Sequence, residues 1–291
     1  MTVFFPWQFM FKSMTYLPGT LLHALKNRDL TTLFSWSKLQ AAWFGRFWAW
    51  AGPQVRQGAE VTVVPLLEGR ITNGSVIPPS DRSTAVHPGI SGAVLEIGPG
   101  SGMWVSIFSD KYQSSSADSS HDQQGKPGHR GRVTRVYGVE PNPAVHPLLR
   151  QQIAKADLQD VYEVVPVGIE DLASSGRVAP QSVDCIVSVL CLCSIPDPER
   201  NIKELYNYLK PGGRWYVYEH VKRERSNSWA VALYQAFVNL FWPHIIGGCE
   251  LQRETGKWLK EAGSWSNIDL VSPKGEPWFM TLPHVVGVLT K

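Results

Sequence analysis

Residues 93–102, AVLEIGPGSG, place a short apolar run directly before three glycines at alternating positions. Such a run is typical of a buried β-strand, and the glycines indicate a tight turn that leaves it. Glycine adopts positive φ angles without strain and lets the backbone approach a bound molecule closely. The stretch therefore predicts a ligand site at the carboxyl end of a strand, as found in open sheets whose strands run parallel.

Strand-like and helix-like segments alternate along the chain from this turn onward. Five apolar segments predict strands that begin near residues 93, 133, 161, 183 and 214, and a strand pair ending in PHVVGVLTK follows them. Helical patterns cover about 102–111, 142–156 and 197–209. This alternation predicts an α/β fold with a Rossmann-like, seven-stranded, mostly parallel sheet sandwiched by helices.

The chain divides into three parts by composition. Residues 1–67 form an aromatic-rich helical segment, residues 68–92 a linker rich in glycine and proline, and residues 93–291 the α/β domain. Apolar residues in the first part recur every three or four positions, which predicts an amphipathic helix: Trp36, Leu39, Trp43, Phe47 and Trp50. Within the α/β domain, the polar residues 113–132 predict a mobile surface insertion.

Charge and cysteine content exclude several classes of protein. The formal net charge of +3 and the lack of a basic track argue against a nucleic-acid partner. Charged residues interrupt every apolar window long enough to span a membrane, and residues 1–14 lack the features of a secretory signal. The spacing of Cys191 and Cys193 does not match a zinc site, and no second pair of cysteines or histidines stands elsewhere at the spacing of zinc ligands. We therefore expect no bound metal. We expect a reduced, cytoplasmic protein.

An acidic residue two positions before the first glycine limits the class of ligand that the turn can bind. Glu96 precedes Gly98, Gly100 and Gly102, so the alternating glycines follow a carboxylate. A turn that binds a pyrophosphate has two residues before its last glycine and a helix N-terminus directed at the phosphates. This turn is one residue shorter, and its carboxylate would repel a diphosphate. The pattern favours a ligand that carries positive charge.

Two later strand ends suit a nucleoside. Glu140 ends the second predicted strand, where a carboxylate can accept hydrogen bonds from both hydroxyls of a ribose. The third predicted strand is followed by Gly168, Ile169 and Glu170. There the isoleucine can pack on an adenine ring and the glutamate can lie near its amino group, although an ordinary polar loop is the alternative interpretation.

Together these residues resemble the class I S-adenosylmethionine-dependent methyltransferases. The resemblance extends from about residue 93 to 291 and includes the segments LCLCS, LKPGG, YEHV and GGCELQRET. Within that class the chain is similar to the membrane-associated proteins that methylate thiols, and to fungal-type O-methyltransferases that tailor polyketides. Pro99, which stands between two of the glycines, departs from the usual pattern and stiffens the turn.

The resemblance implies that the cofactor is S-adenosylmethionine and the product S-adenosylhomocysteine. Glu96 and the three glycines would then hold the amino acid portion of the cofactor, and Glu140 would bind its ribose. The residues expected beside the ribose are Pro141 and Asn142. Those expected beside the sulfonium are Leu190 and Cys191.

Transfer to a neutral hydroxyl or thiol also requires that the acceptor lose a proton. His220 directly follows the fifth predicted strand, at the carboxyl edge where ligands bind in such sheets. An imidazole titrates near pH ~6.5, which suits a general base. His244 is the second catalytic candidate. A purely structural role, in hydrogen bonds to neighbouring helices, is the alternative for both histidines.

The aromatic excess bears on the acceptor. Five of the 12 tryptophans lie in the first 50 residues. An apolar lid over the acceptor site can form from aromatic residues before the domain and after the fifth predicted strand: Trp36, Trp43, Phe44, Phe47, Trp48, Phe237, Phe241 and Trp242. Alternatively, the first helix makes peripheral contact with an intracellular membrane, or the tryptophans fill core. We expect O-methylation of an acidic enol or phenol on a small hydrophobic molecule, such as a hydroxypyrone polyketide of secondary metabolism. The alternatives are S-methylation of hydrophobic thiols at a membrane surface, and a methyltransferase-like cyclase or scaffold that transfers no methyl group.

Overall fold

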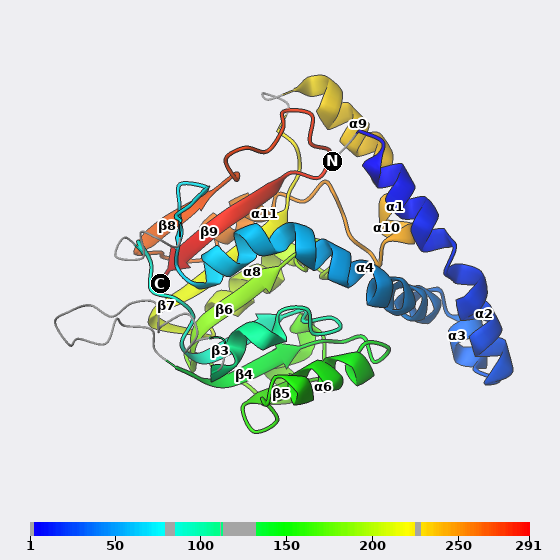
Figure 1. The fold of residues 1–291 in the computed structure, drawn as a ribbon, viewed down its shortest axis with the longest axis horizontal. Helices are drawn as coiled ribbons and strands as arrows, with labels where there is room; N and C mark the ends of the chain where they lie inside the picture. Colours follow the sequence, from blue (N-terminus) through cyan, green and yellow to red (C-terminus); the bar gives the residue numbers. More distant parts are fainter. Residues whose placement is uncertain (1–2, 79–84, 111, 113–131, 225–227) are drawn as a thin grey trace.

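A seven-stranded sheet forms the centre of the molecule (Figure 1). The computed structural model describes residues 3–78, 85–110, 112, 132–224 and 228–291. The strands of the sheet are, in chain order, β3 (Gly92–Ile97), β4 (Val133–Val139), β5 (Tyr162–Val165), β6 (Val183–Val189), β7 (Leu209–His220), β8 (Asn267–Val271) and β9 (His284–Thr290). Their spatial order is β5-β4-β3-β6-β7-β9-β8, and only the pairings of β9 with β7 and β8 are antiparallel. The expected mostly parallel sheet is confirmed.

Helices cover both faces of the sheet because successive strand residues point to opposite sides. Val94 belongs to one buried cluster and Leu95 to another. The first cluster packs the second half of α4 (Trp36–Leu67), the 3-10 helix η2 (Val105–Phe108) and α6 (His146–Lys155) on one face. The second cluster packs α7 (Leu172–Ser175), α8 (Pro198–Tyr206) and α11 (Thr255–Lys260) on the other face.

Several predicted boundaries shift in the structure. The expected helix over 102–111 contains the short η2, and α6 begins at His146 because the chain first turns around Asn142. Pro198 is the first residue of α8, and the Asp197 side chain does not cap this helix. The LKPGG segment is the irregular beginning of β7, where the pairing with β6 shifts register.

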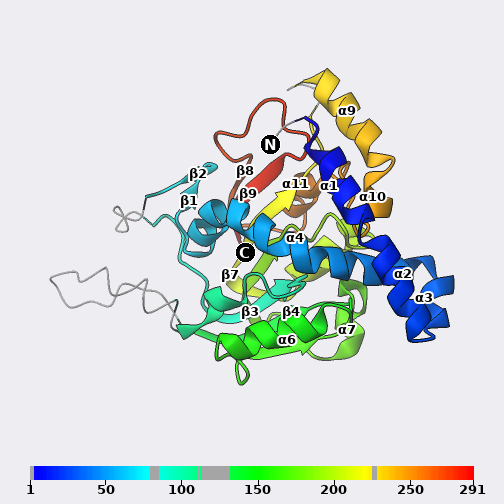
Figure 2. The same ribbon diagram turned by 45° about the vertical axis from the view of Figure 1, so that its right-hand side comes forward.

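The N-terminal part is a set of four helices rather than one. The helices α1 (Phe5–Met14), α2 (Leu17–Lys26) and α3 (Leu30–Phe34) precede the 32-residue α4. Figure 2 shows α4 crossing the molecule, from α2 and α3 at one end to the sheet at the other. Trp43 and Phe47 are buried as the periodicity predicts, whereas Trp36 and Trp50 remain 55% and 38% exposed.

A second helical layer meets α1 beyond the carboxyl edge of the sheet. It consists of α9 (Trp229–Asn239) and α10 (Trp242–Ile245), and both figures place α1 beside them. The Trp7 indole donates a 2.8 Å hydrogen bond to the Tyr234 hydroxyl, while Met10, Phe47 and Trp242 share one buried cluster. The two helical groups therefore form one body above the strand ends.

The expected linker over 68–92 is partly ordered. It contains a small hairpin of β1 (Ile71–Thr72) and β2 (Ser75–Val76). A buried ion pair joins Arg70 to Glu68, and His87 lies 3.0 Å from Asp269 of β8. This segment thus packs on the sheet edge. The expected insertion at 113–132 falls outside the described residues except for its last position.

Candidate active site

The glycine turn after β3 fits a close backbone approach. Gly98 and Gly100 both have positive φ, 62° and 57°. A Cβ on Gly98 would lie 2.7 Å from that of Cys191, and one on Gly100 would lie 3.4 Å from the Trp48 indole nitrogen. Both glycines line the main cavity. Gly102 does not line it; it packs on α6, where a Cβ would meet that of Gln152 at 3.0 Å.

Glu96 departs from the expected site. Its side chain is buried, and the Tyr162 hydroxyl donates a 2.5 Å hydrogen bond to it. The tyrosine reaches across β4 because residue 138 is glycine, whose added Cβ would lie 2.3 Å from that hydroxyl. Glu96 does not line the cavity. The expectation that its carboxylate meets the cofactor is therefore corrected: it points into the core beneath the turn.

Glu140 occupies the position expected of a ribose ligand. It lies directly after β4 and lines the cavity. The Gly100 backbone N–H donates to one carboxylate oxygen at 2.9 Å, and the Asn142 backbone N–H donates to the other at 2.8 Å. Burial raises the pKa of this carboxyl, which the two backbone bonds partly oppose. Each oxygen is oriented by the chain and retains a lone pair for a ligand.

The other expected nucleoside contacts meet at the same place. Pro141, Gly168, Ile169 and Glu170 line the cavity, with Ile169 and Glu170 in the 3-10 helix η3 (Ile169–Asp171) that follows β5. Asn142 also lines it, and its side-chain amide donates a 3.0 Å hydrogen bond to the carbonyl of Ala41 on α4. Asn142 therefore ties the loop after β4 to the long helix above it.

The loop after β6 is held by Glu219, which the sequence patterns did not single out. The Cys191 and Leu192 backbone N–H groups donate to its carboxylate at 3.0 Å and 3.1 Å. These bonds fix Leu190, with φ 55°, and Cys191 on the cavity wall. Burial raises the pKa of Glu219 to about 8. The available signal was a lone acid within the apolar strand YVYEHV, since a buried acid requires partners.

The cavity combines two kinds of wall in a volume of about 680 Å³. Ile97, Val139 and Val189 end β3, β4 and β6 on the sheet side. Helices α1 and α4 close the opposite side with aromatic residues, namely Phe5, Phe9, Phe44, Trp48 and Trp50. Of the aromatic residues expected in a lid over the acceptor, Phe44, Trp48 and Trp242 line the cavity, whereas the contribution of α1 was not expected.

The two candidate histidines differ in whether they reach the cavity. His220, at the end of β7, lines the cavity, and its ring centroid lies 4.7 Å from that of His284 on β9. His284 also lines the cavity; its ring stacks on Tyr218 and hydrogen-bonds Glu276. Burial lowers the pKa of His284. His244 is exposed on α10 and does not line the cavity, so its expected catalytic role is corrected.

Comparison with protein families identifies this arrangement. A family model described as a methyltransferase domain matches residues 81–263. The chain belongs to this methyltransferase family. The S-adenosylmethionine-dependent class and the cofactor predicted from the sequence are thereby confirmed. The matched residues include every strand end that carries the expected cofactor site.

Curated relatives agree on the family. The chain is 36% identical to the thiol S-methyltransferase TMT1B of Homo sapiens and 35% identical to TMT1A of Homo sapiens, each over 159 residues. Each match covers 54% of this chain and 62% of the relative, so the chain spans less than two thirds of the relatives' length. A solved O-methyltransferase family protein from Burkholderia thailandensis shares the fold, with a TM-score of 0.54 and 12% identity over 95% of this chain and 71% of that one.

Of the helices in the part of the chain that the structure describes, none combines the length and apolar character needed to cross a membrane.

Proposed function

We propose that this protein transfers a methyl group from S-adenosylmethionine to the hydroxyl of an acidic enol or phenol on a small hydrophobic molecule. The observation that carries the proposal is a cavity in which two kinds of wall face each other. Its sheet side contains the expected cofactor residues, and its helix side is aromatic. A methyl donor and an apolar acceptor can therefore meet in one cavity.

The residues at the strand ends suit the cofactor. Gly98 and Gly100 line the cavity, and Glu140 presents an oriented carboxylate to the same space. Bound there, S-adenosylmethionine supplies a methyl group on a positively charged sulfur. The chain's own task is to align the acceptor oxygen about 3 Å from that methyl and to exclude water.

The helix wall supports a flat acceptor. The Phe44 and Trp48 rings stack with centroids 5.2 Å apart, and Phe9 lies in the same wall. Aromatic side chains pack favourably on planar conjugated rings. A hydroxypyrone or phenol is flat, apolar and acidic, so it matches this wall. Of the two catalytic candidates from the sequence, His220 lines the cavity and His244 does not, which supports His220 as the residue that handles the proton of the acceptor.

A hydrophobic thiol is the second candidate acceptor. The relatives at 31–36% identity are named thiol S-methyltransferases. The family match begins at residue 81, whereas the aromatic wall comes from α1 and α4, which end before it. The wall proposed to contact the acceptor therefore lies outside the segment that the family model matches.

A direct assay separates these candidates. Purified protein is incubated with labelled S-adenosylmethionine and either a 4-hydroxypyrone with an alkyl chain or an alkane thiol of matched length. We expect label and the mass of one methyl group on the pyrone oxygen. Label on the thiol alone would replace the leading proposal by the second. An altered product without an added methyl group would indicate a cyclase instead.

We further propose that the N-terminal helices contact a membrane surface. Large apolar side chains are exposed at the start of α1, on α1 to α3 and on α9: Phe4, Phe11, Leu22, Leu25, Leu30, Phe34, Trp229, Leu233 and Phe237. The first turns of α1 and α2 carry no acid, and their last turns carry Lys12, His23 and Lys26. Apolar side chains flanked by basic ones suit an anionic lipid surface. Since α1 also lines the cavity, an apolar acceptor can enter from this side.

Sedimentation with anionic phospholipid vesicles tests this contact. We expect the protein to pellet with the vesicles, and the double substitution Phe11→Glu and Phe34→Glu to keep most of it in solution. Trp278→Glu, at a side chain that is 66% exposed elsewhere, is the control. Equal pelleting of all three proteins would contradict the membrane proposal and leave the methyl-transfer proposal untouched.

A further inference from the structure

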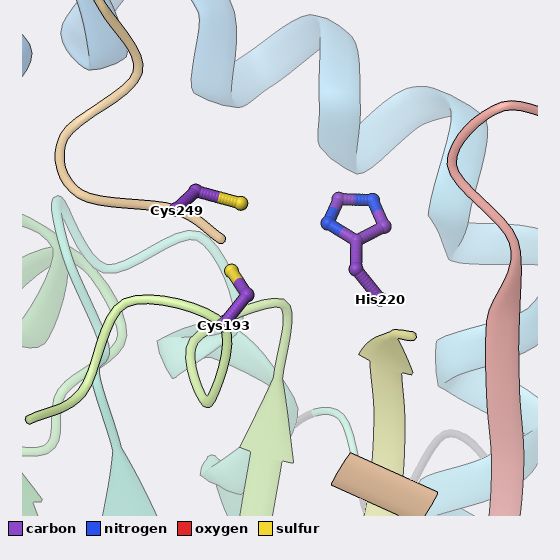
Figure 3. Close-up of side chains that lie close together, drawn as sticks. All are labelled: Cys193, His220 and Cys249. Carbon is purple, nitrogen blue, oxygen red and sulfur yellow. The ribbon is translucent and has the colours of Figure 1, made fainter. Parts of the chain in front are cut away.

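Three potential metal ligands converge on the cavity. The Sγ atoms of Cys193 and Cys249 and an imidazole nitrogen of His220 all lie within 4.8 Å of one another. Figure 3 shows both sulfur atoms and the imidazole ring directed into one space between a loop after β6, the end of β7 and the loop after α10. All three residues line the cavity, where the two cysteines are buried and His220 is partly buried. The cluster therefore lies where the acceptor is expected.

The backbone around the cluster fixes its geometry. The Glu250 N–H donates a 2.8 Å hydrogen bond to the Cys193 carbonyl, which joins the two cysteine segments. Gly247 and Gly248 before Cys249 have positive φ, 54° and 80°. A Cβ at Gly247 would lie 2.6 Å from the Phe44 ring, so this turn requires glycine.

Further contacts hold Cys193 and His220. The Arg253 guanidinium donates to the Leu192 and Ile195 carbonyls at 2.8 Å and 2.6 Å, on either side of Cys193. His220 pairs with His284 in the antiparallel register of β7 and β9. The three side chains therefore face one another without any rearrangement of loops.

Cys185, a cysteine outside the cluster, has different surroundings from Cys193 and Cys249. Cys185, also buried, sits among the apolar residues beneath α4, and its thiol donates to the Ser91 carbonyl at 3.3 Å. Cys193 and Cys249 instead face each other, an imidazole and the cavity. Two thiolates and one imidazole form a donor set that zinc favours, and three protein ligands with one open position are typical of catalytic rather than structural zinc.

We propose that Cys193, His220 and Cys249 bind a zinc ion whose fourth position opens into the acceptor cavity. Binding releases the protons of the two thiols to solvent, because cysteine binds zinc as thiolate. On the proposed function, the acceptor O–H or S–H would take the fourth position and lose its proton to water. The oxygen or sulfur anion would then form a bond to the methyl carbon while the S–CH3 bond of S-adenosylmethionine breaks, and neutral S-adenosylhomocysteine would leave. His220 then acts as a ligand, and the metal replaces a general base.

Metal binding can be measured without turnover. Full-length protein is purified under reducing conditions, and its zinc content is measured by mass spectrometry. The metal is then exchanged for Co²⁺, which gives thiolate-to-cobalt absorption bands at cysteine sites. We expect near-stoichiometric zinc and strong bands in the wild type, and loss of most metal in Cys193→Ser and Cys249→Ser. Cys185→Ser, which lies outside the cluster, should keep both.

Folding is monitored separately by the binding of S-adenosylhomocysteine to each variant. Wild-type protein that binds S-adenosylhomocysteine but takes up neither metal overturns the zinc site, as does a Cys193–Cys249 disulfide found by thiol titration. Full methylation activity after complete metal removal overturns the role given to the fourth position. Zinc-loaded protein that methylates no acceptor overturns the proposed function instead, so the two failures are distinguishable.

Discussion

Two buried glutamates have different environments, and these environments suit them to different roles. Glu96 and Glu140 both lie at strand ends beside the glycine turn and are 3% and 7% exposed. Glu140 accepts two backbone N–H bonds and faces the cavity, whereas Glu96 accepts a tyrosine hydroxyl and faces the core. An acid whose charged form is stabilised by oriented N–H groups suits ligand binding. An acid that only a hydroxyl contacts suits a structural role.

Glu140→Gln should weaken cofactor binding. The amide has one acceptor oxygen instead of two, so it cannot both satisfy the Gly100 and Asn142 N–H groups and receive a ribose hydroxyl. We expect about tenfold weaker binding of S-adenosylhomocysteine, equivalent to about 1.4 kcal/mol, measured by calorimetry. Glu163→Gln, at a carboxylate on β5 that pairs with Arg135 and Arg177, should bind like the wild type. Unchanged affinity in Glu140→Gln would exclude it as a ribose ligand.

Glu96 should make stability depend on pH. Burial raises the pKa of its carboxyl from an ordinary 4.5 to about 7, so the folded protein holds this proton more tightly than the unfolded chain. Its contribution is complete below pH 4.5 and is lost as the pH rises through 7, with an upper limit on the order of 3 kcal/mol. Urea unfolding should therefore show that Glu96→Gln loses less stability than the wild type across this range. Parallel curves for the two proteins would refute this.

At the scale of elements, α4 connects cofactor and acceptor sides. Its Ala41 carbonyl accepts a hydrogen bond from Asn142 in the loop after β4, and its Gln40 amide donates to the Pro243 carbonyl of α10 at 2.8 Å. Gly45 allows close approach to the same loop, since a Cβ there would lie 3.0 Å from that of Ala144. Movement of α4 would therefore change both sides of the cavity, whereas α1 contributes only to the acceptor wall.

Trp7→Ala should weaken binding of the acceptor and leave binding of the cofactor unchanged. Trp7 holds α1 on α9 through its bond to Tyr234 and its ring contacts with Phe237 and Phe241. Release of α1 displaces the wall that contains Phe9. We expect the KM for the acceptor to rise about tenfold, about 1.4 kcal/mol, with little change in kcat or in calorimetric affinity for S-adenosylhomocysteine. Trp278→Ala should leave all three unchanged; a matching loss of cofactor affinity in Trp7→Ala would show that α1 supports the whole site.

At the scale of the whole molecule, the site exists only where the two bodies meet. The strand ends supply one wall of the cavity, and a helical layer with its own buried cluster supplies the other. Residues that line this space are drawn from α1 at one extreme of the sequence to His284 at the other. Ligand binding should consequently stabilise the protein as a unit.

S-Adenosylhomocysteine should raise the free energy of unfolding. At a concentration about 100 times its Kd, a ligand that binds only the folded state stabilises it by about 2.7 kcal/mol. Denaturant unfolding should show this shift in the presence of S-adenosylhomocysteine and no shift with a nicotinamide or flavin nucleotide. Comparable stabilisation by a dinucleotide would contradict the interpretation of the glycine turn.

The sequence by itself determined the sheet, the turn after β3 and the position of Glu140 at the end of β4, because these features follow from local periodicity and from residues next to one another in the chain. Only the tertiary structure decided where side chains from distant segments meet. Glu96 turned away from the cavity because Gly138 admits Tyr162 across the sheet. Cys193, His220 and Cys249 share no short spacing, and they converge because three separate segments end above the same strands. Such convergence depends on packing between remote elements, which no local pattern encodes.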